Sequence, residues 1–196
     1  MHQNQYIWLA SASPRRKELL DQVRIPFRQI VPDVDETKFS ASSCEELVTM
    51  LAQEKALAAK QKLIKEDIDI HPIIAADTLV TLGAEPLGKP RNRNEAVTML
   101  SRLSGRQHSV FTAVVVATSA CVYSEVVETR VFFKALSATE IEGYCDSGEP
   151  FDKAGAYGIQ GQAGAFVTRM EGSYSAVVGL PLFETVNLLS KVRARQ

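Results

Sequence analysis

The feature that most constrains this chain is the segment 71–80, HPIIAADTLV, in which an aspartate stands inside an apolar run. Residues 73–76 follow a proline and are continuously apolar, which predicts a short strand buried on both faces. Asp77 comes next, and a carboxylate there loses hydration at a cost of several kcal/mol unless it is paired, protonated or metal-bound. Asp77 is therefore either a strand-end residue that accepts hydrogen bonds from a turn or a functional group. Other features of the chain favour a functional group.

The charge balance excludes one broad class of function. The chain has 196 residues, 45% of them apolar, which is normal for a globular protein with a real core. Lysine and arginine total 22 and aspartate and glutamate total 23, so the formal net charge is −1. This balance argues against nucleic-acid binding driven by phosphate attraction, but it permits a local basic pocket for one small anion.

Cysteine usage and hydropathy predict a reduced, cytoplasmic protein. Cys44, Cys121 and Cys145 are odd in number and far apart, with no C-x-x-C pair, so neither a disulfide framework nor a zinc site is indicated. The N-terminal stretch MHQNQYIWLA lacks the basic flank and long apolar core of a signal peptide. No apolar run reaches the ~20 residues of a membrane span, so we expect no membrane partner.

The segment 6–23 predicts a strand, a tight loop and a helix. Residues 6–10 are apolar, Ser13 suits an N-cap, and Pro14 suits the first helical position. Backbone amides at a helix N-terminus can bind an anion, with Arg15 and Arg16 adding charge and the hydroxyls of Ser11 and Ser13 as further donors. The alternative is an ordinary capped helix with exposed arginines.

Carboxylates and a lysine follow in the next segments. A strand over 27–31 precedes Asp33-Val34-Asp35-Glu36, which is either a solvated acidic loop or a source of oxygen ligands for Mg²⁺ or Mn²⁺. A long helix is predicted over 44–65, with a capping box at Ser42/Glu45 or Ser43/Glu46. Lys55 falls on its apolar face, so this lysine must either extend to solvent or meet an anion.

The second half of the chain predicts further elements. Lys89 and Arg91 lie in a proline-bounded loop, 86–91, that could hold a triphosphate. Helices are expected after Asn92 and Ser137, and a long β-hairpin is expected from 107–117 and 122–134. Residues 148–161 form a glycine-dense loop, and glycines allow backbone to come close to a ligand. Strand 165–170 precedes a last helix from Pro181, whose expected inward residues are Phe183, Val186, Leu189 and Val192.

The ordered set of motifs resembles the Maf-like nucleoside triphosphate pyrophosphatase family. The matching segments are SASPRRKELL at 11–20, VDET at 34–37, AQEKA at 52–56, AADT at 75–78, GKPR at 88–91, LSG at 103–105, DKAGAYGIQG at 152–161 and GSYSAVVGLP at 172–181. The resemblance spans nearly the whole chain. It implies one domain over 1–196 with an elongated, two-lobed α/β (mixed α+β) fold of the Maf and inosine-triphosphatase kind, a bent mixed sheet and a central cleft.

The resemblance also implies cleavage of a nucleoside triphosphate to the monophosphate and pyrophosphate. Asp77 matches the position of the proton acceptor, and Glu36, Lys55 and Lys89 match charged cleft residues. Base preference is set at the positions that Arg15, Thr78 and Gln160 match. Thr78 together with the I-Q-G at 159–161 resembles the dTTP/UTP subgroup, so these two nucleotides are the expected substrates.

The residue types suit that chemistry. We expect Glu36 and Asp77 to hold Mg²⁺ or Mn²⁺, which lowers the pKa of bound water and bridges phosphate oxygens. The side chains of Lys55, Lys89 and Arg15 are suited to holding the triphosphate and stabilising the leaving pyrophosphate. Gln160 both donates and accepts, which matches the amide-like edge of uracil or thymine. A homodimer is expected because the family often forms one.

Two alternatives stay open at this point. One is a nucleotide-binding regulator of cell division without turnover, although a pure binder of an anionic triphosphate gains nothing from Glu36 and Asp77 unless it uses a metal. The other is a pyrophosphatase directed at purine nucleotides such as inosine or xanthosine triphosphate. A panel of nucleotide substrates separates both from the pyrimidine enzyme.

Overall fold

The computed structural model describes residues 6–194, so residues 1–5 and 195–196 of the expected 1–196 domain, including MHQNQ, lie outside it. The described chain divides into two compact units. Unit 1 comprises 6–77, 112–126 and 179–194, and unit 2 comprises 78–111 and 127–178. That the two units act as one domain stays a prediction. Within the described range, no helix combines the length and apolarity that crossing a membrane requires.

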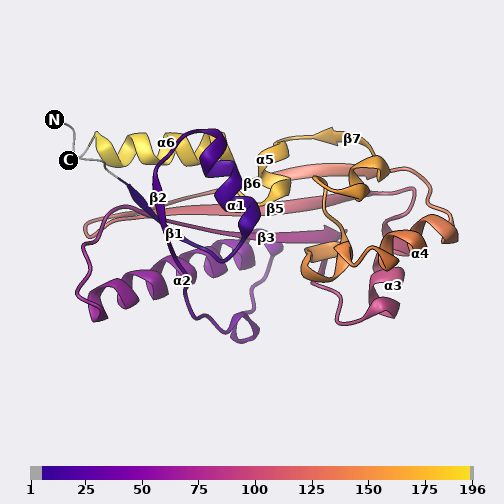
Figure 1. The fold of residues 1–196 in the computed structure, drawn as a ribbon, viewed down its shortest axis with the longest axis horizontal. Coiled ribbons are helices and arrows are strands. Elements are labelled where there is room, and N and C mark those ends of the chain that lie inside the picture. Colours follow the sequence, from indigo (N-terminus) through magenta and orange to yellow (C-terminus); the bar gives the residue numbers. More distant parts are fainter. Residues whose placement is uncertain (1–5, 195–196) are drawn as a thin grey trace. The chain divides into compact units, whose positions relative to one another are not determined.

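A seven-stranded mixed sheet underlies the fold (Figure 1). Its order is β2-β1-β3-β5-β6-β7, and β4 pairs with β3 off this path. Strand β1 is parallel to β2 and β3, whereas β4 and β7 are antiparallel to their partners, so the predicted mixed α/β class is confirmed. The strands are β1 Ile7–Ala10, β2 Phe27–Ile30, β3 Ile73–Leu82, β4 Glu85–Leu87, β5 Gln107–Ala117, β6 Val122–Phe133 and β7 Val167–Glu171.

Three α-helices begin at capping residues that the sequence indicates, namely Ser43, Asn92 and Ser137. Ser43 Oγ accepts from the amide of Glu46 at 3.1 Å, and Ser137 with Glu140 forms a complete capping box. The helices are α1 Pro14–Gln22, α2 Cys44–Lys65, α3 Arg93–Leu103, α4 Ala138–Asp146, α5 Tyr174–Val178 and α6 Leu182–Arg193. Short 3₁₀ turns are η1 Glu36–Lys38, η2 Glu149–Asp152, η3 Ala154–Ala156 and η4 Gln162–Phe166.

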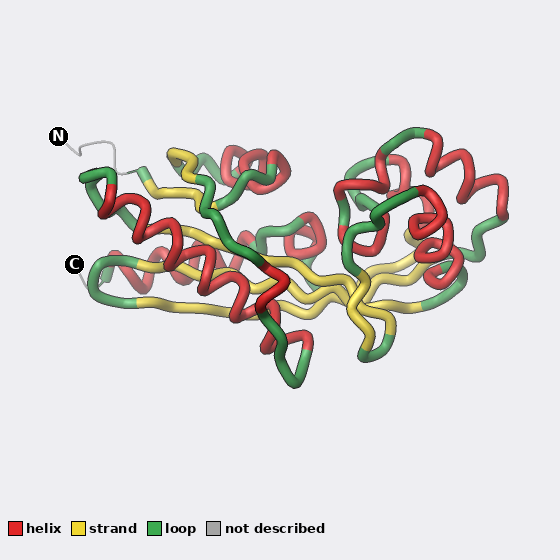
Figure 2. The backbone as a smooth tube through the Cα atoms, turned by 90° about the horizontal axis from the view of Figure 1, so that it is seen from below, coloured by secondary structure: helices red, strands yellow, loops and turns green. Residues whose placement is uncertain are grey.

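Helices α2 and α6 cover opposite sides of the strands of unit 1 (Figure 1). Figure 2 shows the long helix α2 crossing over these strands. Its buried stripe consists of Val48, Leu51, Ala52, Ala56, Ala59 and Leu63. Against this stripe lie β1 and the start of β3, in which residues 7–10 and 73–76 are apolar and buried at every position. Burial on both faces fits strands that stand between two helical layers.

Two expectations about unit 1 are wrong. Strand β3 does not end before Asp77 but continues to Leu82, so the aspartate lies in the middle of a strand. In α6, Phe183 is 73% exposed and Val186 is 42% exposed. The stripe that α6 buries contains Thr185, whose hydroxyl donates to Pro181 O at 2.7 Å. With this polar group satisfied locally, Thr185 joins Leu188, Leu189 and Val192 at helical spacing, and the inward face is rotated from the expected one.

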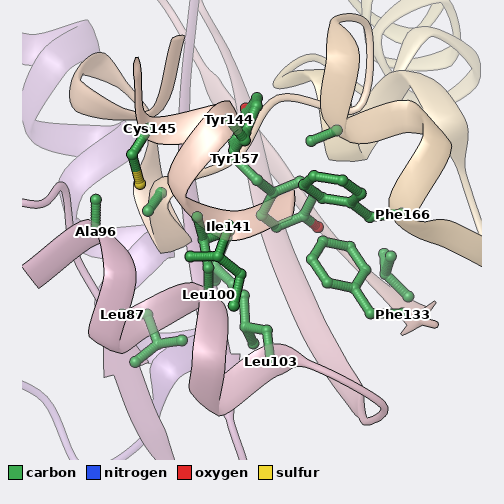
Figure 3. Packing of buried hydrophobic residues seen from close by; sticks show 14 of the residues in the cluster. Leu87, Ala96, Leu100, Leu103, Phe133, Ile141, Tyr144, Cys145, Tyr157 and Phe166 are labelled. Atoms are coloured by element: carbon green, nitrogen blue, oxygen red, sulfur yellow. The ribbon is translucent and has the colours of Figure 1, made fainter. Parts of the chain in front are cut away.

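Unit 2 has its own core, in which aromatic rings meet edge to face (Figure 3). The ring centroid of Phe133 lies 4.9 Å from that of Tyr157 and 6.0 Å from that of Phe166. Helix α3 contributes Ala96, Leu100 and Leu103, as its spacing predicts. Around this core, η2 packs against α3 and α4, η3 packs against α3, and η4 lies next to β7.

His108 is a buried titratable group within this core. It is 2% exposed, its Nε2 lies 2.8 Å from the hydroxyl of Tyr157, and its ring meets that of Phe133 edge to face. Burial lowers the pKa of His108 to about 4. The folded state therefore holds this imidazole neutral at a pH where the unfolded chain protonates it.

We expect acid to destabilise the protein through His108. Because the folded pKa lies below the unfolded value, the stability due to neutral His108 is fully present above pH 6.5 and falls as the pH drops towards 4. From pH 7.5 to pH 5 the free energy of unfolding should lose about 2 kcal/mol from this residue. Urea unfolding of wild type and His108→Gln at both values checks this. An equal pH dependence in the two proteins would contradict it.

Candidate functional site

The candidate site of unit 1 is centred on the ammonium group of Lys55, which lies between two carboxylates. Its Nζ donates to Asp77 Oδ1 at 2.5 Å and lies 2.7 Å from Glu36 Oε1. Asp77 is 6% exposed, whereas the side chain of Glu36 is largely exposed. One cation thus joins a buried carboxylate on β3 to a solvent-facing carboxylate on η1.

The position of Lys55 follows from its place on α2. The residue lies in the buried stripe between Leu51 and Ala59, so its stem is enclosed and its side chain is largely buried. Of the two outcomes open to such a lysine, contact with anions is the one observed. A helix that packs on β3 therefore delivers a positive charge to the carboxylate in the middle of that strand.

Burial and charge act in opposite directions on Asp77. Burial is the largest effect and raises the pKa of this carboxyl above its ordinary value. The charge and hydrogen bond of Lys55 lower it, as does the charge of Arg16, while the nearby Glu36 raises it slightly. Perturbation of this kind by desolvation and specific partners is typical of functional carboxylates.

The acidic segment before α2 divides its carboxylates between two tasks. Asp35 caps η1, because its Oδ1 accepts from the hydroxyl of Thr37 at 2.6 Å and from the Thr37 amide at 3.2 Å. These bonds lower the pKa of Asp35. Asp33 is exposed, and Glu36 is the member of the three that reaches Lys55. The turn that Asp35 stabilises therefore aims Glu36 at the site.

The serine and arginine segment forms a second part of unit 1. Ser11 is buried, and its Oγ accepts from the amide of Ser13 at 3.1 Å and from Arg16 Nη1 at 3.0 Å. Arg16 Nε donates to Gly179 O at 2.8 Å. Ser13 is the N-cap residue of α1 by position, but its side chain makes no capping hydrogen bond. The first turn of α1 is thus fixed mainly through Ser11 and Arg16.

Arg16 belongs electrostatically to the same site as Asp77. Burial lowers the pKa of Arg16, and the negative charge of Asp77 opposes this effect. Arginine is so strong a base that the guanidinium of Arg16 keeps its positive charge despite this burial. Arg15 is half-buried beside it, on the first turn of α1.

The remaining predicted site residues belong to unit 2. Thr78 follows Asp77 directly on β3 and is half-buried. Lys89 is exposed in the loop after β4, and Gln160 is exposed between η3 and η4. Their roles toward a substrate stay predictions.

Two residues that fix the serine and arginine segment were not singled out from the sequence. Gln29 on β2 donates through Nε2 to Ser11 O at 2.7 Å, and Gly179 supplies the carbonyl for Arg16. Gln29 gives no signal, since a glutamine on a half-exposed strand is common. Gly179 stands inside the motif GSYSAVVGLP and has φ 128°, a backbone conformation that favours glycine, so the motif was the available indication.

The donor set fits a metal that arrives together with a nucleotide. Among residues 6–194 no group of three or more histidine, cysteine, aspartate and glutamate side chains is arranged to hold a metal by itself. Glu36 and Asp77 nevertheless offer two carboxylates on either side of one cation. Mg²⁺ is commonly bound by one or two carboxylates plus substrate phosphates and water, and these two carboxylates are ligands of that kind.

We expect Lys55→Met to destabilise the fold strongly, because it leaves Asp77 buried without its cation. Removing one partner of a buried pair costs about 3–5 kcal/mol. Adding Asp77→Asn should restore most of that loss, because the uncompensated charge is then gone. The loss of unfolding free energy in Lys55→Met should be largest at neutral pH. It should shrink towards pH 4, where the raised pKa of Asp77 allows the carboxyl to be neutral. Urea unfolding of all three variants measures this.

Lys65→Met on the last turn of α2 is the matched control, since Lys65 is exposed and its replacement should change stability by less than about 0.5 kcal/mol. A Lys55→Met protein as stable as this control would show that Asp77 does not depend on Lys55.

Comparison with known proteins extends these observations to the whole chain. The sequence profile of the family described as "Maf-like protein" matches residues 6–192. A Salmonella typhimurium protein named dTTP/UTP pyrophosphatase is 50% identical over 188 residues, covering 96% of this chain and 93% of that protein. Relatives of the same name from Vibrio cholerae and Bordetella avium are 50% and 46% identical, covering 93% and 94% of this chain and 96% and 94% of their own lengths.

Among solved structures, the Ham1 protein of Staphylococcus aureus aligns with a TM-score of 0.46 and 17% identity, over 97% of this chain and 100% of that one. The family match covers nearly all of the described residues, and the identity to the Salmonella typhimurium protein extends over almost the full length of both chains. The resemblance in the motifs is therefore confirmed, and this chain belongs to the Maf-like protein family.

Proposed function

We propose that this protein is a nucleoside triphosphate pyrophosphatase that hydrolyses dTTP and UTP to the monophosphate and pyrophosphate. The observation that carries the proposal is the buried Asp77, held beside Lys55 and Glu36 at hydrogen-bond distance. The names of the relatives from Salmonella typhimurium, Vibrio cholerae and Bordetella avium agree with the activity and the nucleotides that the motifs predict. Such an enzyme removes nucleotides from the cellular pool.

The proposed reaction is attack of water on the α-phosphorus. A bond forms between the water oxygen and the α-phosphorus, the bond to the oxygen bridging the α- and β-phosphates breaks, and pyrophosphate leaves. Asp77 orients the water and accepts its proton, which its raised pKa favours relative to an exposed aspartate. Lys55 holds the carboxylate in place and presents charge to the phosphates.

Charge balance supports the use of a divalent cation. In unit 1 the cations Lys55 and Arg16 are matched by the anions Glu36 and Asp77, so the cluster itself neutralises little of a triphosphate. We propose that Glu36 and Asp77 hold Mg²⁺ or Mn²⁺ together with the nucleotide. When bound, such an ion neutralises phosphate charge and lowers the pKa of coordinated water. Ser11, Ser13, Arg15 and Arg16 bind the phosphates at the start of α1, and Lys89 adds a further cation.

Selection of the base is assigned to Thr78, Gln160 and Arg15. The amide of Gln160 can donate and accept at once, as the Watson–Crick edge of uracil or thymine requires. An exposed glutamine on a glycine-dense segment is free of competing core packing, which suits contact with a ligand. A site built to pair with a base rejects bases that leave its polar groups unpaired.

The two alternatives make different demands on these residues. A regulator of cell division that only binds nucleotide has no use for a carboxylate whose burial costs stability, whereas a hydrolase does. A purine-directed pyrophosphatase would retain Asp77 and Lys55 but would need another partner for the base than the one proposed for Gln160. We further propose that the enzyme acts in the cytoplasm, as a homodimer, without binding nucleic acid or membrane.

Pyrophosphate release from a panel of nucleoside triphosphates, with Mg²⁺ or Mn²⁺ and with chelator, tests the proposal. We expect dTTP and UTP to be the best substrates, and chelator to abolish turnover. Asp77→Asn should lower kcat by roughly 10²–10⁴-fold while remaining folded, because asparagine is nearly isosteric but neither accepts the proton nor provides an anionic ligand.

Release of single orthophosphates, full activity in chelator, or near-wild-type turnover by folded Asp77→Asn would each contradict the proposed reaction. Preference for inosine or xanthosine triphosphate would instead favour the purine-directed enzyme, and no turnover of any nucleotide despite binding would favour the regulator.

Gln160→Ala separates base recognition from chemistry. A hydrogen bond lost at the base costs about 1–3 kcal/mol, roughly tenfold to a hundredfold in kcat/KM. We expect the penalty to fall on dTTP and UTP, with weak purine substrates little changed, so that selectivity narrows. Asp77 and Glu36 are proposed to act at the phosphates, so Asp77→Asn and Glu36→Gln should lower kcat/KM for every substrate alike. If Gln160→Ala lowers kcat/KM for all nucleotides by the same factor, the residue serves phosphate binding or loop structure instead.

A further inference from the structure

The glycine-dense segment of unit 2 is built around one carboxylate, that of Glu149. This residue begins η2 and is half-buried. Its Oε1 accepts from the hydroxyl of Tyr144 at 2.8 Å, and its Oε2 accepts from the backbone amide of Gln162 at 3.1 Å. Hydrogen bonds to an ionised acceptor are among the stronger ones in proteins, so Glu149 ties the segment firmly to α4.

Tyr144 extends this connection to the opposite side of the segment. Its hydroxyl oxygen accepts a hydrogen bond from the amide of Gly158 at 3.2 Å, and the same hydroxyl donates a hydrogen bond to Glu149. The ring is buried and meets that of Phe166 edge to face, with centroids 5.3 Å apart (Figure 3). Burial raises the pKa of the Tyr144 phenol above its ordinary range, and so does the bond to Glu149, so the hydroxyl stays protonated and able to donate.

The two anchored amides lie symmetrically about Gln160. Gly158 precedes it by two residues and Gln162 follows it by two. Between them the backbone closes on itself, since the amide of Gly161 donates to Gly158 O at 3.1 Å. The backbone that presents Gln160 is therefore held at both ends by the Tyr144–Glu149 pair.

The glycines on either side of Gln160 are explained by the same arrangement. Gly161 has an ordinary φ of −100°, but a Cβ there would overlap the carboxylate of Glu149. A Cβ at Gly158 would come within 2.6 Å of Cε of Lys153, whose ammonium donates to Glu149 O at 2.7 Å. A side chain at Gly161 would therefore displace the Glu149 carboxylate, and one at Gly158 would displace the Lys153 side chain, although the backbone angle at Gly161 is ordinary.

We propose that Glu149, together with Tyr144, is a positioning residue for Gln160 and thereby sets the preference for a pyrimidine base. The inference rests on the proposed function, in which Gln160 contacts the base. Glu149 itself bonds a tyrosine and a backbone amide, so it acts on the substrate through the position of its neighbour.

A merely structural anchor and a positioning residue predict different kinetics. An anchor that only maintains the fold lowers stability and lowers the turnover of all nucleotides together. A residue that positions the base contact raises KM for the matching bases and leaves kcat nearly constant, because the phosphate chemistry of unit 1 is not altered. Its effect also disappears once Gln160 is gone, because residues that act as a unit are not additive.

Steady-state kinetics of Glu149→Ala, Glu149→Gln and Tyr144→Phe with dTTP, UTP and a purine triphosphate make the comparison. We expect Glu149→Ala to raise KM for dTTP and UTP about tenfold, with kcat and the purine substrate little changed. Glu149→Gln retains an acceptor oxygen and should lie between Glu149→Ala and wild type. Glu149→Ala combined with Gln160→Ala should be no worse than Gln160→Ala alone. Glu142→Ala, an exposed glutamate on α4, is the matched control.

Hydrogen exchange of the Gly158 and Gln162 amides gives a readout independent of activity, with faster exchange expected in Glu149→Ala. The positioning role would be overturned by unchanged amide exchange in Glu149→Ala, by an equal loss of kcat/KM on all nucleotides, or by additive losses in the double variant. None of these results would affect the proposed function, provided that the wild-type protein turns over dTTP. A wild-type protein that fails to turn over dTTP or UTP would overturn the proposed function, and this inference with it.

Discussion

A carboxylate in the middle of a buried strand is the constraint on which unit 1 depends. Strand β3 continues through Asp77, so the backbone cannot turn to expose this side chain to water. An isolated charge at such a place is expensive, and the structure compensates it with Lys55, delivered from the buried stripe of α2. The requirement extends further, because Glu36 then binds the outer side of Lys55 and needs the turn that Asp35 stabilises. Helix, turn and strand are thus connected through one ammonium group.

The compensated charge is consistent with the phosphate chemistry proposed for these residues. In the proposed reaction, Lys55 and Asp77 would exchange one charged partner for another, because the phosphates offer negative charge to Lys55 and the metal ion offers positive charge to Asp77. Arg16 is held in a similar way, by Ser11 on one side and by the carbonyl of Gly179 on the other. Such fixed groups lose little side-chain entropy on binding, which is how pre-organised sites gain affinity and rate.

Local signals in the sequence were sufficient for several elements and insufficient for others. Helix α2 lies at the predicted residues 44–65, because capping at Ser43 and a long apolar stripe agree with each other. The predicted inward face of α6 was wrong. Threonine is a polar residue, yet Thr185 is buried, because its hydroxyl donates to the carbonyl of Pro181 at the start of the same helix. Spacing placed Lys55 on a buried face but not opposite Asp77, since pairing between α2 and β3 is a tertiary contact. Glu149 gave no signal, because its bonds go to the hydroxyl of Tyr144, across the end of α4, and to the backbone amide of Gln162, and no periodicity records such contacts.

The most direct measurement of the central claim is the pKa of Asp77 in the folded protein, from ¹³C-detected NMR titration of its carboxyl group, with Asp77→Asn used to assign the signal. Burial should shift this pKa above the range of ordinary aspartates. The signals of the Lys55 ammonium group should also change as Asp77 titrates, because the two groups are hydrogen-bonded. A pKa at or below that of an exposed aspartate, without coupling to Lys55, would mean that Asp77 is solvated and that the site described here does not form.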